Sequence, residues 1–398
     1  MEAFGQMRLT SDLQQDHSSG RSRRARLRLG ALICLGALLA TGCDSVATGS
    51  STGAPPPPAR IVVLNAASGT IKQIDEATNH VVSTTRAGTS DEALVVAPDG
   101  KFAFVGGSHL YRVSLLGASS TRELGGIGGL IAQVALNSTG LTGLVIGERR
   151  ERIALIDTTT NKLKELNLGS ATELGGPLEA VFLPNGRTAY VSTSNGFVVP
   201  VYTSSGKVGS PIDVGGDLPD YMAATPNGLE MYVVSLDAND VTVIDTTTNK
   251  VVETIDVGRW PGLVVITPNG KTAYVGNFLG ETVSVINVVD NKITATIAVG
   301  DAPGDMVFSP DGKTLYVVVD GLKEVTPIRV GATTAEAPIK FTQVIGQIVL
   351  QSDGRGAYLT THGPSAHQVI PLNLVSKMPG KPIDVGKDSF LIEIAAAR

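Results

Sequence analysis

One turn motif recurs along most of this chain at a nearly constant spacing. Its full form, Pro-Asp-Gly or Pro-Asn-Gly, occupies residues 98–100, 184–186, 226–228, 268–270 and 310–312. Degenerate copies stand at residues 137–140 and 352–354, and the last four steps between the turn glycines are each 42 residues. A repeat of this length with several short strands is typical of a β-propeller, in which each repeat forms one blade.

Each repeat contains four short segments with the character of β-strands. In one well-preserved copy they are residues 263–266, 272–275, 282–286 and 293–299. The third segment alternates apolar and polar side chains as a half-buried strand does, and Pro-Asn-Gly and Asp-Asn favour tight reversals between consecutive strands. The repeats therefore predict an all-β fold of four-stranded antiparallel blades.

The two ends of the repeat region are predicted to share one blade. Residues 61–88 align without a gap to residues 273–300, so they supply the second, third and fourth strands. Residues 390–395 have the pattern of a first strand that no second strand follows. A blade shared by the N- and C-terminal strands closes the ring and removes its free edges. Eight blades are the preferred count, and seven the alternative if one degenerate repeat does not form.

An aromatic residue follows each turn glycine at a fixed distance. Four residues after the glycine stand Tyr190, Tyr232, Tyr274, Tyr316 and Tyr358, with Phe104 and Leu144 at the equivalent positions. A ladder of ligand-binding rings is one interpretation. Because the position recurs on the second strand of each blade, we predict instead that these rings pack between blades.

The first 42 residues have the composition of a bacterial export signal. Residues 21–28 are basic, and residues 29–40 are an apolar run too short to span a bilayer. Ala-Thr-Gly-Cys at 40–43 resembles a lipobox, which implies cleavage before Cys43 and a lipid on its thiol. An ordinary cleaved signal is the alternative, and residues 22–27 also resemble a twin-arginine signal.

Three segments follow from these observations. Residues 1–42 are the predicted signal peptide, residues 43–59 the lipidated Cys43 with a Pro/Ser/Gly-rich tether, and residues 60–398 the β-propeller. The two cysteines are Cys34, inside the apolar run, and Cys43, so none remains for a disulfide in the exported domain. We expect a monomer anchored to the outer face of a bacterial membrane, at the cell surface or in the periplasm.

The best-preserved repeat also resembles a known family. Pro-Asn-Gly-Lys-Thr-Ala-Tyr-Val-Gly-Asn at 268–277, followed by Thr-Val-Ser-Val-Ile-Asn at 282–287, is similar to the repeats of YVTN-type β-propellers. Shorter copies begin at Tyr190, Tyr232 and Tyr316, and the resemblance spans residues 60–398. It implies the fold but specifies no activity, since members include surface-layer and periplasmic binding proteins.

The predicted strand order assigns the loops to two faces. The turns between strands one and two and between strands three and four repeat, whereas the turns between strands two and three and the links to the next blade vary. Rigid scaffolds usually carry function on such varied loops. The candidate ligand-binding residues of this variable face are Asp217, Asp220, Asp237, Asp240, Arg259, Trp260, Phe278, Glu281, Asp301 and Asp305.

The link residues support this choice of face. Prolines at 177, 219, 261 and 303 recur every 42 residues, but the residue two places earlier differs in each link, as a ligand without symmetry requires. Trp260 follows Arg259, and this pairing is enriched at binding hot spots. The plainer alternative is that the charges keep the loop tips solvated while Trp260 packs between blades.

Composition limits the partners and cofactors. Without residues 1–42 the chain has 26 basic and 34 acidic residues, a net charge of −8, which disfavours nucleic acid. No cofactor is predicted, although the charge density at Asp217, Asp237, Asp240 and Asp301 also suits Ca²⁺ without EF-hand spacing. His362 and His367 flank one variable loop, but a histidine pair without a third ligand is usually only polar surface.

These observations favour a lipid-anchored, non-catalytic binding or scaffolding module of the cell envelope, whose ligand is a protein, a polymer or a small molecule. The alternative is a propeller enzyme, either a lactonase or other hydrolase or a cofactor-dependent dehydrogenase, with its site at the channel mouth. No catalytic residue can be named, because the repeat region, residues 60–398, contains no Gly-x-Ser-x-Gly elbow, phosphate loop or catalytic cysteine.

Overall fold

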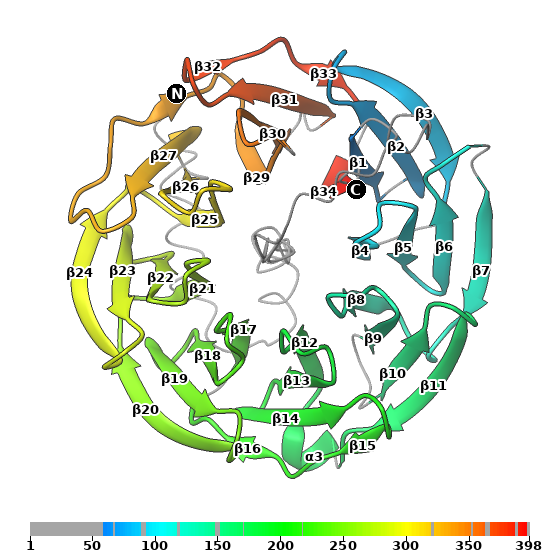
Figure 1. Cartoon of the computed structure of the whole chain (residues 1–398), viewed down its shortest axis with the longest axis vertical. Coiled ribbons are helices and arrows are strands. Elements are labelled where there is room, and N and C mark those ends of the chain that lie inside the picture. Colours follow the sequence, from blue (N-terminus) through cyan, green and yellow to red (C-terminus); the bar gives the residue numbers. More distant parts are fainter. Residues whose placement is uncertain are drawn as a thin grey trace, which may run out of the picture. The chain divides into compact units, whose positions relative to one another are not determined.

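The computed structural model describes residues 59–395, except for residues 67, 89–92, 118–119, 148–151, 170, 217, 320–321, 352, 363–366 and 387–388. The described residues all belong to the larger of two units into which the chain divides, residues 34–398. They form eight antiparallel sheets arranged in a ring, so the chain is an eight-bladed β-propeller (Figure 1). The predicted fold class and the preferred blade count are confirmed.

We number the blades I to VIII around the ring and give their strands from the innermost outward. Blade I consists of β34 (Ser389–Ala395), β1 (Arg60–Asn65), β2 (Thr70–Asp75) and β3 (His80–Arg86). Blade II consists of β4 (Ala93–Val96), β5 (Phe102–Gly106), β6 (Leu110–Ser114) and β7 (Thr121–Gly125). Blade III consists of β8 (Ile131–Leu136), β9 (Thr142–Gly147), β10 (Arg152–Asp157) and β11 (Lys162–Asn167).

Blade IV consists of β12 (Pro177–Phe182), β13 (Thr188–Thr193), β14 (Phe197–Tyr202) and a divided outer strand, β15 (Lys207–Val208) and β16 (Ile212–Asp213). Blade V consists of β17 (Pro219–Ala224), β18 (Glu230–Ser235), β19 (Asp240–Asp245) and β20 (Lys250–Asp256). Blade VI consists of β21 (Pro261–Ile266), β22 (Thr272–Asn277), β23 (Thr282–Asn287) and β24 (Lys292–Ala298).

Blade VII consists of β25 (Pro303–Phe308), β26 (Thr314–Val319), β27 (Glu324–Arg329) and β28 (Ile339–Lys340). Blade VIII consists of β29 (Ile345–Leu350), β30 (Gly356–Thr361), β31 (Gln368–Asn373) and the outer pieces β32 (Met378–Pro379) and β33 (Ile383–Asp384). One short helix, α3 (Ala171–Leu174), lies in the link from blade III to blade IV.

Blade I closes the ring with strands from both ends of the repeat region. Its innermost strand β34 pairs antiparallel with β1, from Arg60 opposite Ala395 to Asn65 opposite Ser389. Residues 61–64 of β1 are fully buried between β34 and β2. The predicted closure, with the N-terminal segment as strands two to four and the C-terminal segment as strand one, is confirmed.

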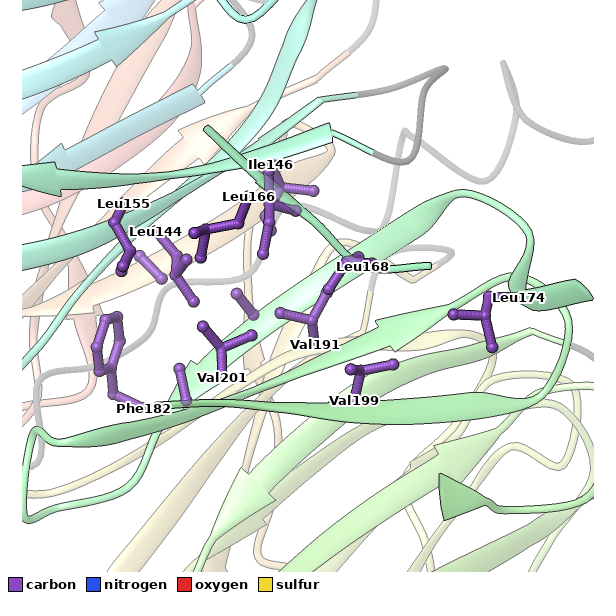
Figure 2. Packing of buried hydrophobic residues seen from close by; sticks show 14 residues of the cluster. Leu144, Ile146, Leu155, Leu166, Leu168, Leu174, Phe182, Val191, Val199 and Val201 are labelled. Carbon is purple, nitrogen blue, oxygen red and sulfur yellow. The ribbon is translucent and has the colours of Figure 1, made fainter. Parts of the chain in front are cut away.

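Neighbouring blades bury apolar layers between them, as at the junctions of blades II to V, of blades VII and VIII, and of blades VIII and I. Between blades III and IV, Leu144 and Leu155 face Phe182 and Val201, and all four side chains are buried (Figure 2). These residues alternate along their strands with residues of the opposite blade face, which pack against the next neighbour. The core is therefore a series of layers around the ring, one between each two blades.

The recurrent aromatic residues belong to these layers, as predicted. Tyr190, Tyr232, Tyr274 and Tyr358 are completely buried, and Phe104 is 1 % exposed. The tyrosine hydroxyls do more than pack, because they reach the turn between strands three and four of the next blade. Tyr190 donates to Asn249 Oδ1 at 2.6 Å, Tyr358 to Asn79 Oδ1 at 2.6 Å, and Tyr232 to Asn291 Oδ1.

The repeated turn motif also joins neighbouring blades. A Cβ atom placed on Gly228, Gly270 or Gly312 would lie 3.2–3.3 Å from a ring carbon of the turn proline one blade earlier. In these turns the glycine thus packs against the proline of the previous turn. This contact explains why both residues recur, in addition to their role in the turn itself.

Candidate functional site

The turns between strands two and three and the links between blades form one continuous surface over blades V and VI. The backbone carbonyl of Asn239, in the turn of blade V, accepts a hydrogen bond from Val257 N at 2.9 Å. The link then contacts the turn of blade VI, where Phe278 N donates to Trp260 O at 2.8 Å and Leu279 N donates to Arg259 O at 3.2 Å. We call residues 235–240, 256–261, 277–282 and 298–303 the variable-face patch.

The backbone at Trp260 adopts a conformation that bulky residues rarely adopt. Its φ is 51°, in the left-handed region, and its amide donates to Asn239 Oδ1 at 2.7 Å. Leu218 and Ala302, at the same place in the neighbouring links, have φ values of 61° and 55°. The three links therefore have a common backbone conformation but carry different side chains, and the half-buried indole of Trp260 is the largest of them.

Two asparagines position the patch, and sequence reasoning missed both. Besides Asn239, Asn277 accepts from Gly258 N at 3.1 Å through Oδ1. Its Nδ2 donates to Thr282 Oγ1 at 3.0 Å and to Ser284 Oγ at 2.9 Å. Asn277 is the last residue of the family-like segment 268–277, so the resemblance contained the signal, but only the structure shows that it clamps the link onto the turn.

The structure distributes the predicted site residues over different environments. Asp237, Arg259, Glu281 and Asp301 are exposed on the variable-face patch. Asp240, Trp260 and Phe278 are half-buried there, and Asp220 is half-buried on β17. Asp217 and Cys43 lie outside the described residues.

Asp305 lies inside the ring, with a side chain only 6 % exposed. Its carboxylate accepts from Met306 N and from Ile348 N of the next blade, both at 2.9 Å, while burial raises its pKa to about 6. Side-chain oxygen atoms on other innermost strands accept from backbone amides of the following blade in the same way. Gln133 accepts from Ala180 N (2.7 Å), Glu179 from Met222 N (2.7 Å) and Gln347 from Ile392 N (3.2 Å). The Asp305 carboxylate is thus part of a recurrent inter-blade contact.

Two further carboxyl groups of the innermost strands have perturbed acidity. Burial raises the pKa of Glu179 on β12 well above its usual value. Burial, together with the charge of Asp305, raises the pKa of Glu393 on β34 to about 8. The sequence did not point to either residue, because the residues around each of them in the strand are mainly apolar.

Clustered metal ligands and long apolar helices are absent from the described part of the chain. No group of three or more His, Cys, Asp or Glu side chains is arranged to hold a metal ion there. His362 and His367 are both half-buried and flank residues 363–366, which are outside the described set. Among the described residues, no helix has the length and apolarity to cross a membrane.

These features define the class of the protein: an eight-bladed β-propeller with a uniform frame and one asymmetric loop face. No protein-family model and no curated protein sequence matches the chain. Among solved structures, dihydro-heme d1 dehydrogenase NirN in complex with DHE superposes with a TM-score of 0.72 at 15 % identity, covering 84 % of this chain and 74 % of that one.

Two other solved structures are also similar to the chain. A functionally unknown protein from Desulfotomaculum acetoxidans has a TM-score of 0.58 at 13 % identity, covering 84 % of this chain and 98 % of that one. Kuenenia stuttgartiensis hydrazine synthase has a TM-score of 0.48 at 23 % identity, covering 55 % and 69 %. At these identities the likeness of the first two establishes the fold alone.

Proposed function

We propose that this chain is an exported, lipid-anchored propeller of the YVTN type that binds a cell-envelope partner through the variable-face patch. The basic and apolar segments before Cys43 support export and anchoring, and the repeat at 268–277 supports the family. In this proposal the ring is a rigid frame, and recognition comes from the side chains on the links and turns of blades V to VII.

The observation that carries the proposal is the common conformation of three links with unlike side chains. Leu218, Trp260 and Ala302 share one left-handed backbone position. A scaffold that repeats its backbone and varies the side chain presents different chemistry at each step of one surface. Trp260 lies there between the exposed Arg259 and the half-buried Phe278. An aromatic residue beside a cation on a preorganised loop is typical of a binding hot spot.

Site-specific photo-cross-linking in intact cells tests this surface. A photoreactive amino acid is placed at Leu279, which is 37 % exposed on the patch, and separately at Val289, which is 83 % exposed in a turn of the opposite face. We expect a discrete adduct from position 279 that disappears when Trp260→Ala and Asp237→Ala are added. Adducts of equal yield at both positions, or an adduct that survives the two substitutions, would contradict binding at the patch.

Lipid attachment has an independent test with a matched control. Cys43→Ala should abolish incorporation of labelled fatty acid and release the protein from the membrane fraction. Cys34→Ala removes the only other cysteine and should change neither result. Retention of the label in Cys43→Ala would show that the segment is an ordinary signal peptide or that another residue is modified.

A second candidate function, an enzyme with its site at the channel mouth, is favoured by the innermost strands. Asp305 and Glu393 have pKa values raised to about 6 and about 8, in the range useful for proton transfer near neutral pH. Purified protein would be screened against lactones and, given the fold likeness to a dihydro-heme d1 dehydrogenase, by absorbance titration with haem. Turnover lost in Glu393→Gln would support this function, and turnover unchanged in that variant would argue against these groups.

A further inference from the structure

One position in the middle of the blades carries a charged side chain only in blade II. It is the residue on the third strand that lies directly opposite the recurrent aromatic position of the second strand. From blade I to blade VIII this residue is Gln73, Arg112, Leu155, Pro200, Val243, Val285, Pro327 and Pro371. Arg112 is thus a cation at a place where the other blades have neutral, mostly apolar residues.

Arg112 lies on the face of blade II that packs against blade III. Its cross-strand partner Phe104 is buried in the layer between these two blades, and directly opposite residues share one face of a sheet. The guanidinium of Arg112 stacks on Phe102, with Cζ 3.5 Å from the ring centroid. Its Nε is buried and makes no hydrogen bond within the described part of the chain. A buried donor in this state is costly unless another group accepts from it.

The fourth strand places a second cation beside the first. Arg122 on β7 lies directly opposite Arg112, whereas the equivalent residue of blade V is Glu253, an acid that would neutralise an arginine. Burial and the charge of Arg122 both lower the pKa of Arg112. The charge of Asp99 opposes them with a smaller effect, and Asp99 itself pairs with Lys101 at 3.7 Å. Two like charges on adjacent strands repel unless an anion lies between them.

We propose that Arg112 and Arg122 bind a phosphate group, carried either by inorganic phosphate or by a phosphate monoester. A guanidinium group donates two parallel hydrogen bonds to the oxygen atoms of such an anion, and arginine is common where phosphate is recognised. A phosphate monoester carries a charge of about −1.5 to −2 near neutral pH, which balances two guanidinium groups, whereas a carboxylate balances only one. The stacked Arg112 is the preorganised half of this site, and the exposed Arg122 is the half that solvent reaches.

The charge of the rest of the chain favours a single phosphate group over a long polyanion. Without residues 1–42 the chain has 26 basic and 34 acidic residues, whereas a nucleic acid requires an extended basic surface. The two arginines lie on β6 and β7, the outer two strands of blade II, so the ligand reaches them from the rim of the ring (Figure 1). The variable-face patch lies on blades V and VI, and phosphate binding at blade II does not depend on it.

Equilibrium dialysis of the full-length protein with labelled inorganic phosphate at low ionic strength tests the proposal. We expect saturable binding that Arg112→Gln and Arg122→Gln each weaken about tenfold or more, the effect of losing one hydrogen bond to a charged group. Sulfate, which is also a tetrahedral dianion, should displace the phosphate, and acetate at the same concentration should not. Displacement by methyl phosphate as well would identify a phosphorylated ligand, whereas displacement by inorganic phosphate and sulfate alone would identify the free ion; either result supports the site.

Two control variants keep the result interpretable. Arg152→Gln removes an exposed arginine of blade III that already pairs with an acid of its own blade at 3.0 Å, and it should leave phosphate binding unchanged. Arg112→Val combined with Arg122→Ala reproduces Val285 opposite Ala295 in blade VI and should give a folded protein without this site. Absence of saturable binding in the wild type, equal displacement by acetate, or binding retained in the double variant overturns the proposal and leaves the recognition function of the variable-face patch untouched.

Discussion

The two faces of the ring differ in how far their side-chain contacts repeat from blade to blade. On the face of the Pro-Asn-Gly turns the contacts repeat: a turn glycine seats on the preceding proline, and a tyrosine hydroxyl reaches an asparagine of the next blade. On the variable face a backbone contact also recurs, from a link amide to the carbonyl of the preceding turn, as in Val257 N to Asn239 O and Val299 N to Glu281 O. The side-chain contacts of this face differ from blade to blade, as when Asn239 Oδ1 accepts from Trp260 N, or when Glu324 pairs with Lys340 within blade VII. The repeated contacts build the ring, whereas the single contacts position individual side chains.

This difference indicates where substitutions should affect stability and where they should affect recognition. A repeated contact is buried between two blades, so its loss exposes or strains the core. A contact of the variable face fixes one loop, so its loss should change what the loop presents at little cost to the fold. The predictions below test this division, starting with the largest expected effect.

Removal of residues 389–398 should abolish folding, because it deletes β34, the innermost strand of blade I, and with it the closure of the ring. The layer between blades I and VIII contains Ile392 together with Ile61, Val63 and Tyr358, and it would lose its innermost strand. Circular dichroism and gel filtration should show an unfolded or aggregated chain. A synthetic peptide of residues 389–398 added at excess should restore the fold. A truncated chain that unfolds cooperatively at the wild-type temperature would show that closure is dispensable.

Gly140 and Gly215 offer a matched comparison of the two faces, since both have a φ of +69°. Alanine at either position costs about 1 kcal/mol for the left-handed conformation. At Gly140 the new Cβ would also lie 2.7 Å from Pro98 Cδ, whereas at Gly215 no described atom lies within 4 Å. Overpacking should therefore raise the loss in unfolding free energy to about 3 kcal/mol for Gly140→Ala alone.

Chemical denaturation of the two alanine variants measures that difference. Equal losses would mean that the proline contact contributes nothing beyond the turn. A larger loss for Gly215→Ala would reverse the assignment of the two faces.

The regular contacts are also the part of the molecule that the sequence predicted well. The 42-residue period, the turn residues and the tyrosine position each depend on local pattern, so they predicted the blade, the number of blades and the closure. The site was only partly predictable. The sequence identified the links that carry Arg259 and Trp260, but the clamps of Asn239 and Asn277 depend on contacts between segments about twenty residues apart. Asp305 lies two residues after a recurrent link proline, and the pattern alone does not show that its carboxylate turns inward.

Glu393 interrupts the regular interior and should make stability depend on pH. Its raised pKa, about 8, means that the folded state favours the neutral acid. This stabilising preference is fully present below the unfolded pKa near 4.5 and is lost as pH rises through 8. Glu393→Gln should therefore gain stability over the wild type as pH rises, by about 2 to 3 kcal/mol at pH 9, a value reduced because the side chain is only partly buried.

Urea denaturation from pH 5 to pH 9 follows this effect, with Glu281→Gln on the variable face as the control. We expect the difference between Glu393→Gln and the wild type to be smallest at pH 5, to grow as pH rises towards 8, and to level off by pH 9. A constant difference across the range would mean that Glu393 has the same acidity in the folded and unfolded chain.

Tyr232→Phe tests one of the repeated hydroxyl contacts. The substitution keeps the buried ring but leaves Asn291 Oδ1, in the turn of blade VI, without its donor. The loss in unfolding free energy should be about 1 to 2 kcal/mol, the lower part of the range for an unsatisfied acceptor, because Asn291 is only half-buried. A double-mutant cycle with Asn291→Gly, which preserves the left-handed φ of 54°, isolates the pair. A coupling energy near zero would mean that Tyr232 stabilises the protein through the packing of its ring and not through its hydroxyl.

The reverse substitution should stabilise a blade junction where the hydroxyl partner is missing. Asn161 stands in the turn of blade III with the same left-handed backbone as Asn249 and Asn291, but its buried Oδ1 has no hydrogen-bond partner in the described structure. The residue that would reach it is Phe104 of blade II, which has no hydroxyl. Phe104→Tyr should add that donor and raise the unfolding free energy by about 1 kcal/mol. The gain should vanish in the Asn161→Gly background, because the acceptor is then absent. A destabilised Phe104→Tyr protein would mean that this junction is packed too closely for the hydroxyl, and that the repeated contact is not interchangeable between blades.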